Sequence, residues 1–143
     1  MTFDVATFDV SDTTDVTLNH PKTGEPFLVD VEVDDGEGGK KTVKKPMSVT
    51  VYGPGSQEFE AAQAQSEKSF GLSFHRGKSR ETQAQKKARI ASFLSACTIS
   101  FNNFTYGGGD PKDRETFRAC YSDPKRNWLT EQVNLEMGDW SNF

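Results

Sequence analysis

The chain carries few of the side chains from which active sites are commonly built. Its two histidines, His20 and His75, and its two cysteines, Cys97 and Cys120, lie far apart in the sequence. Structural zinc sites use closely spaced ligands, and no C-x-x-C pair is present. Both cysteines fall on apolar faces of predicted helices, which is typical of buried, inert thiols. We therefore expect no metal site and no cysteine nucleophile.

Two glycine-rich segments, GPGS at 53–56 and YGGGD at 106–110, are the nearest approach to phosphate-binding loops. The first follows a predicted strand without the lysine that a Walker loop requires, and neither matches the dinucleotide fingerprint or a G-x-S-x-G elbow. Carboxylates are numerous, but most fall in predicted loops or at helix starts, where they cap and solvate the backbone. We interpret both segments as turns and expect neither enzymatic activity nor a cofactor.

The charge balance and hydropathy restrict the possible partners. The formal net charge of the 143 residues is -4, which disfavours nucleic acid, because affinity for nucleic acid comes from neutralising phosphates. No apolar run approaches the roughly 18 residues needed to span a membrane. The N-terminus lacks the basic and apolar regions of a signal peptide. We expect a protein of a reducing cytoplasm, with two free, buried thiols.

The most apolar stretch, residues 88–106, predicts the element around which the rest of the chain packs. At about 100° per residue its apolar side chains share one helical face. This face consists of Ile90, Phe93, Leu94, Cys97, Phe101 and Phe104. We expect helix to about Phe101, although T-I-S-F at 98–101 also alternates as a short strand does. The three glycines at 107–109 end the stretch.

The N-terminal half has the alternation of β-strands. The runs VTLN, FLVDVEV and MSVTVYG predict a three-stranded antiparallel meander within residues 16–53. The segment DDGEGGKK between the last two runs is expected to be a flexible tip, and its charge runs to be solvated. Residues 1–15 repeat TFDVA and TFDVS, and we expect either a strand that adds to a sheet edge or a loose arm.

Helix signals dominate residues 56–143. Ser56 predicts a helix from Gln57 to about Lys68, followed by a break at Gly71 and Gly77. Two Asp-Pro pairs, at 110–111 and 123–124, predict two further helix starts. Their expected buried faces consist of Phe117, Cys120 and Tyr121, and of Leu129, Val133, Met137 and Trp140, with Trp128 beside the second. Core packing is favoured for both tryptophans. The predicted fold is α+β: an antiparallel β-meander packed with three to four C-terminal helices, in one domain over residues 16–143.

The C-terminal half resembles a known class of proteins. An aromatic stretch SFLSACTISFNNF, a glycine turn, a short helix ending RACYSDP and a last helix RNWLTEQVNLEMGDWSNF follow one another. This order resembles small morphogenesis proteins of tailed bacteriophages, in particular tail assembly chaperones encoded beside the tail-tube gene. The matching positions are Tyr121, Asp123, Pro124, Gln132, Val133, Asn142 and Phe143. The resemblance covers about residues 46–143, and the P-x-x-G at 21–24 looks like the opening of such proteins.

The resemblance implies non-enzymatic work in virion assembly in the host cytoplasm. A chaperone of this class binds tape-measure and tube proteins while the tail forms, and then leaves. One alternative is a structural subunit of the capsid surface or tail, found in the virion; a second is a small inhibitor of a host enzyme. The expected partners are phage tail or capsid proteins, not nucleic acid or membrane, and the sequence leaves homo-oligomerisation open.

We expect protein contacts at three places: the N-terminal arm, the basic stretch before the central helix, and the aromatic C-terminus. The predicted contact residues are Phe3, Phe8, Arg76, Lys78, Arg80, Lys86, Lys87, Trp140 and Phe143. The basic stretch favours an acidic protein partner, while aromatic residues are common anchors of protein interfaces.

Overall fold

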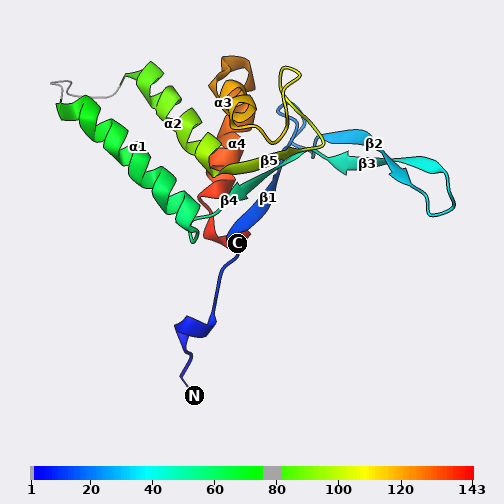
Figure 1. The fold of residues 1–143 in the computed structure, drawn as a ribbon, viewed down its shortest axis with the longest axis horizontal. Helices are drawn as coiled ribbons and strands as arrows, with labels where there is room; N and C mark the ends of the chain where they lie inside the picture. The colour runs from blue at the N-terminus through cyan, green and yellow to red at the C-terminus, as the bar shows by residue number, and fades with distance from the viewer. Residues whose placement is uncertain (1, 76–81) are drawn as a thin grey trace.

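A three-stranded antiparallel sheet joins the two halves of the chain. The computed structural model describes residues 2–75 and 82–143 and has the predicted α+β fold (Figure 1). The sheet has the order β1-β4-β5, formed by β1 (Thr13–Thr17), β4 (Ser48–Tyr52) and β5 (Thr98–Asn102). The helices gather beside this sheet, whereas the N-terminal arm and a β-hairpin leave it in different directions.

Strand β5 corrects the prediction of helix to about Phe101. Helix α2 (Gln83–Cys97) ends at Cys97, and the next five residues pair with β4, where Phe101 lies opposite Val49. Thr98 and Ile99 are β-branched and suit a pleated surface. Phe101 is still buried, but by the sheet and not by a helical face. The two halves therefore share one sheet, a question that the sequence left open.

The hairpin of β2 (Leu28–Asp34) and β3 (Lys40–Pro46) stands apart from this sheet. The three predicted runs correspond to β1, β2 and β4, but β3 was not predicted. The predicted meander is also wrong, because β2 pairs with β3 and β1 pairs directly with β4. Asp34, Lys40 and Lys41 of the expected flexible tip belong to the two strands, while residues 35–39 form the turn between them. The acidic run of β2 faces the basic run of β3, with Asp34 opposite Lys40 and Asp30 opposite Lys44. Such opposite-charge pairs stabilise a strand pair.

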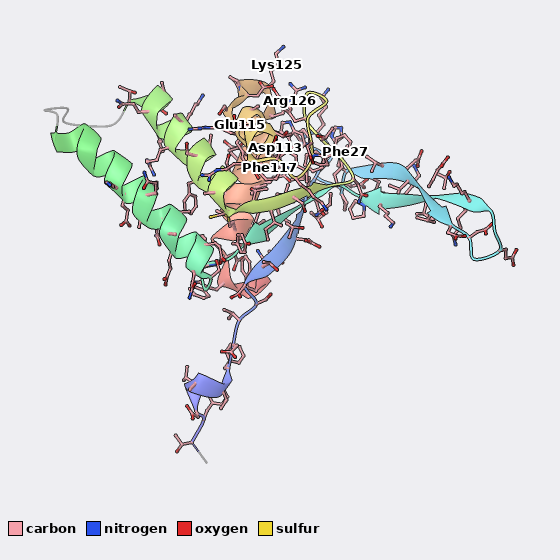
Figure 2. The ribbon with its side chains drawn as sticks, viewed as in Figure 1. Phe27, Asp113, Glu115, Phe117, Lys125 and Arg126 are labelled. Atoms are coloured by element: carbon pink, nitrogen blue, oxygen red, sulfur yellow. The ribbon has the colours of Figure 1, made fainter. Side chains whose placement is uncertain are left out.

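Phe27 fixes the base of this hairpin. Its ring stacks on His20, with centroids 5.3 Å apart, and on Trp128, with centroids 6.4 Å apart. Figure 2 shows Phe27 where the hairpin leaves the body of the protein. Backbone hydrogen bonds also attach the hairpin to the sheet. Phe27 N–H donates to the Leu18 carbonyl and Met47 N–H donates to the Phe27 carbonyl, both at 2.8 Å. The predicted packing of Trp128 is confirmed by its half-buried position against the core.

Helix α1 (Gln57–His75) is longer than predicted and passes through Gly71, so the expected break there is wrong; Gly77 lies outside the described residues. A capping box of Thr82 and Gln85 begins α2. No helix in the described part of the chain is long and apolar enough to cross a membrane.

Helix α3 (Arg114–Ser122) begins later than the first Asp-Pro pair predicted. Residues 110–113 form a turn in which Asp113 N–H donates to the Asp110 carbonyl, and Asp113 then caps the helix. Figure 2 shows Asp113 and Glu115 at this helix start. The second pair behaves as predicted: Asp123 caps a 3-10 turn, η2 (Pro124–Arg126), which leads into α4 (Asn127–Met137).

The core forms where α2, α3 and α4 meet the sheet. The predicted faces of α3 and α4 are confirmed, since all their members except Trp140 are buried. Core side chains on the sheet and α2 include Val16, Val49, Val51, Leu94 and Cys97. Trp140 belongs instead to a 3-10 turn, η3 (Trp140–Asn142), and is 57% exposed, so its predicted core position is wrong. Gly138 and Asp139 end α4 and turn the chain outward, which removes Trp140 from the helical face.

Candidate protein-interaction surface

The structure separates the predicted contact residues into distinct places. Phe3 and Phe8 lie on the projecting arm and are 69% and 65% exposed. Lys86 and Lys87 are exposed on α2, and Trp140 is exposed on η3, whereas Phe143 is half-buried. Three more predicted residues, Arg76, Lys78 and Arg80, lie outside the described residues.

The C-terminus and the root of the N-terminal arm do come together. Ser11 N–H donates to the Phe143 carbonyl at 2.9 Å, and the Phe143 ring covers Gly53 so closely that no side chain fits there. Gly55 faces both Val10 and Trp140. The predicted arm and the predicted aromatic C-terminus therefore share one end of the sheet, next to strand β1.

Strand β1 presents an open sheet edge. The backbone groups of its even-numbered residues face β4. The flanking bonds show this, because Leu18 N–H donates to the Met47 carbonyl and Gly53 N–H donates to the Asp12 carbonyl. Backbone groups alternate in direction along an antiparallel strand, so those of Asp15 and Thr17 point away from β4. Within the described residues nothing bonds to these outward groups. They can pair with an added strand.

Both ends of this edge are closed. At one end the Ser11 hydroxyl donates to the Thr13 carbonyl at 2.8 Å, and Ser11 N–H is bonded to Phe143. At the other end the Gln132 side chain accepts from Asn19 N–H and donates to the Asn19 carbonyl, each at 2.8 Å. The open window is therefore only a few residues long, which limits uncontrolled edge-to-edge pairing.

A hollow of about 510 Å³ runs beside this window, between β1 and the end of α4. Leu135 lines it and is 74% exposed, the largest exposed fraction among the big apolar side chains of the described residues. Asp15 and Glu136 add negative charge to its walls. We define the β1-edge surface as Asp15, Thr17, Leu135 and Glu136. It suits an extended segment with an apolar side chain and little negative charge.

Sequence reasoning missed this surface, but one signal was present. Leu135 lies out of phase with Leu129, Val133 and Met137, which follow one another at four-residue intervals along the buried face of α4. A single exposed apolar residue is common on protein surfaces, so this signal gains meaning only from the hollow and the open strand beside Leu135. The sequence carries no comparable signal for the open edge, because the sequence of β1 alone does not show which strands lie beside it.

The lysines of α2 do not form a purely basic surface. Lys86 and Lys87 line a hollow of about 180 Å³ together with Asp123 and Glu131 of the α3–α4 region. Asp123 accepts a hydrogen bond from the Tyr106 hydroxyl at 2.7 Å, and this bond, more than any other contact, lowers the pKa of that carboxyl. The mixed charge gives this region no simple preference for an acidic partner.

The cysteines are free and buried, as predicted. Burial raises the pKa of Cys97 to about 12 and that of Cys120 to about 11, against an ordinary value of 9.0. Both thiols therefore stay protonated near neutral pH and are poor nucleophiles. In the described part of the chain, no three His, Cys, Asp or Glu side chains are grouped so that they could hold a metal ion.

The β1-edge surface thus combines backbone groups that have no bonding partner among the described residues with one exposed apolar side chain. The chain was compared with protein-family models, with curated proteins and with solved structures. None of them matches it.

Proposed function

We propose that this protein is a non-enzymatic bacteriophage virion-assembly protein, a tail assembly chaperone that binds an extended segment of a tail protein along β1. One observation carries the proposal: the open window at Asp15 and Thr17, closed at both ends and flanked by the exposed Leu135. The sequence resemblance in residues 46–143 supplies the biological setting.

The β1-edge surface suits reversible binding. An added strand would gain only a few backbone hydrogen bonds, each contributing about 1 kcal/mol net. Leu135 would add one apolar contact, and full burial of a leucine side chain contributes about 1.5–3 kcal/mol. The sum is small enough for release once the bound segment finds its place in the tail. Asp15 and Glu136 would disfavour acidic segments.

A capture experiment tests the proposal. The protein is co-expressed with the tail-tube and tape-measure proteins of the same phage, and the captured partners are identified. Thr17→Pro removes the outward N–H at a position where edge strands tolerate proline, and Leu135→Asp removes the apolar contact. Both variants should lose the tail protein. The control Leu28→Asp changes another exposed leucine, 49% exposed on the hairpin, and should retain it.

Two results would contradict the proposal: capture of neither tail protein by the unchanged chain, or equal capture by Thr17→Pro, Leu135→Asp and Leu28→Asp. The folding of each variant is checked by its cooperative unfolding. Recovery of one host enzyme without tail proteins would favour the inhibitor class.

A permanent structural subunit is the second candidate, because two elements project from the body. The arm before β1 and the β2–β3 hairpin both stand clear of the sheet (Figure 1). Such projections are suited to fixed contacts with neighbouring subunits. Mass spectrometry of purified particles separates the two candidates, since stoichiometric presence would contradict a transient chaperone and absence would contradict a structural subunit.

A further inference from the structure

The N-terminal arm ends in a small, ordered apolar knob. A 3-10 turn, η1 (Val5–Thr7), is capped by Asp4, whose side chain accepts from Ala6 N–H at 3.0 Å. The turn brings the rings of Phe3 and Phe8 edge to face, with centroids 6.4 Å apart. Val5 beside them is 72% exposed. We define the knob as Phe3, Val5 and Phe8. An exposed aromatic pair held in one arrangement is the kind of anchor that protein interfaces use.

The β2–β3 hairpin has an apolar face that its own chain leaves open. Val31 lies opposite Val43, Val33 opposite Lys41 and Val29 opposite Lys45, so these six side chains share one face. Of the four valines only Val29 reaches the main hydrophobic cluster. The opposite face carries the Asp30–Lys44 ion pair at 3.6 Å. We define the valine face as Val29, Val31, Val33, Val43, Lys41 and Lys45. A two-stranded hairpin is marginal alone and gains stability when such a face is covered.

Charge indicates what covers the valine face. Among the described residues neither Lys41 nor Lys45 has an ion-pair partner. The arm carries two acidic residues, Asp4 and Asp9, and no basic residue between 2 and 10. An acidic segment with an aromatic anchor therefore complements the basic rim and apolar centre of the valine face.

The arm and the hairpin of one copy are poorly placed to meet. The arm precedes Thr13 at one end of β1, whereas the hairpin is attached beyond Thr17 at the other end. Figure 1 shows them leaving the body in different directions. Contact within one chain would require the arm to reverse across the sheet. A second copy needs no such reversal.

We infer that the knob of one copy docks on the valine face of a second copy, so that the protein associates head to tail. The two surfaces differ, so each added copy presents a free knob or a free valine face, and association closes into a ring or continues as a filament. This inference does not depend on binding of a tail protein at the β1-edge surface.

Sedimentation velocity of the full chain over the micromolar to millimolar range tests this. The unchanged protein should form dimers and larger species. Phe3→Ser/Phe8→Ser, which damages only the knob, and Lys41→Glu/Lys45→Glu, which damages only the valine face, should each weaken association roughly tenfold or more. An equimolar mixture of the two variants should form dimers and nothing larger. The first variant keeps its valine face and the second keeps its knob, so each pair has one working contact.

Dimers that form in the mixture, but not in either variant alone, would establish head-to-tail pairing. A symmetric knob-to-knob contact cannot give this result. A monomeric unchanged chain, variants that associate like the unchanged chain, or a mixture without dimers would overturn the inference. Circular dichroism of both variants must match that of the unchanged chain, and Leu28→Ser, on the other face of the hairpin, should associate normally.

Discussion

Gln132 binds the backbone of Asn19 through both ends of its side-chain amide. The amide oxygen accepts from Asn19 N–H and the amide nitrogen donates to the Asn19 carbonyl, each at 2.8 Å. A helix side chain thereby takes the place of a neighbouring strand just beyond β1. This contact ties α4 to the sheet and marks where the open window ends.

Removal of this contact should destabilise the fold and lengthen the open edge. Gln132→Ala leaves two backbone groups of Asn19 without their partner and should lower the free energy of unfolding by about 1–2 kcal/mol. Asn134→Ala, at an exposed position of the same helix, should change it by less than about 0.5 kcal/mol. Urea unfolding compares the two, and equal stabilities would show that the Gln132 contact contributes nothing.

The core of α2 should respond unequally to truncation at two neighbouring positions. Leu94 is fully buried, so Leu94→Ala should cost about 3–4 kcal/mol. Phe93 is half-buried and packs edge to face on Phe59, with centroids 5.3 Å apart. Phe93→Ala should therefore cost about 2 kcal/mol, less than a fully buried phenylalanine would. A larger loss at Phe93 than at Leu94 would contradict this order.

The buried thiols should make stability fall in alkaline solution. Burial raises the pKa of Cys97 from 9.0 to about 12 and that of Cys120 from 9.0 to about 11. Above about pH 9 the unfolded chain loses these protons while the folded chain keeps them, so the free energy of unfolding should decrease as pH rises from 9 towards 11. Denaturant unfolding across this pH range measures the slope.

The double variant Cys97→Ala/Cys120→Ala should show a smaller alkaline decrease than the unchanged protein. A thiol reagent should also label the folded protein only slowly at neutral pH, and quickly after denaturation. Rapid labelling of both cysteines in the folded state would contradict their buried positions.

Gly53 should be required for docking of the C-terminus. A methyl group at this position would overlap the Phe143 ring. Gly53→Ala should therefore displace Phe143 and release the Ser11–Phe143 hydrogen bond, seen as faster amide exchange at Ser11. Gly138→Ala is a suitable control because its added methyl meets only ordinary contacts. Unchanged exchange at Ser11 in Gly53→Ala would mean that this end of the sheet does not depend on the aromatic contact.

The sequence predicted best those elements whose buried side chains are close together along the chain. Leu129, Val133 and Met137 are buried on α4, and Cys120 and Tyr121 on α3, as their spacing indicated. The α+β class also followed from local alternation and helix starts.

The errors arise where a distant segment decides the structure. Phe101 fits the helical phase of α2, but pairing with Val49, more than fifty residues earlier, makes it part of a strand. The open edge of β1 depends in the same way on which strands flank it. Trp140 left the face of α4 because the helix ends at Met137. Local periodicity contains no information on these long-range choices.

The β1-edge surface is tested most directly by amide hydrogen exchange of Asp15 and Thr17, measured on the full chain alone and with the tail-tube or tape-measure protein. In the free protein both amides should exchange rapidly, while Val16 and Leu18, bonded toward β4, stay protected. Binding should slow exchange at Asp15 and Thr17. Protection of these two amides in the free protein, or no change on addition of either tail protein, would contradict strand addition at β1.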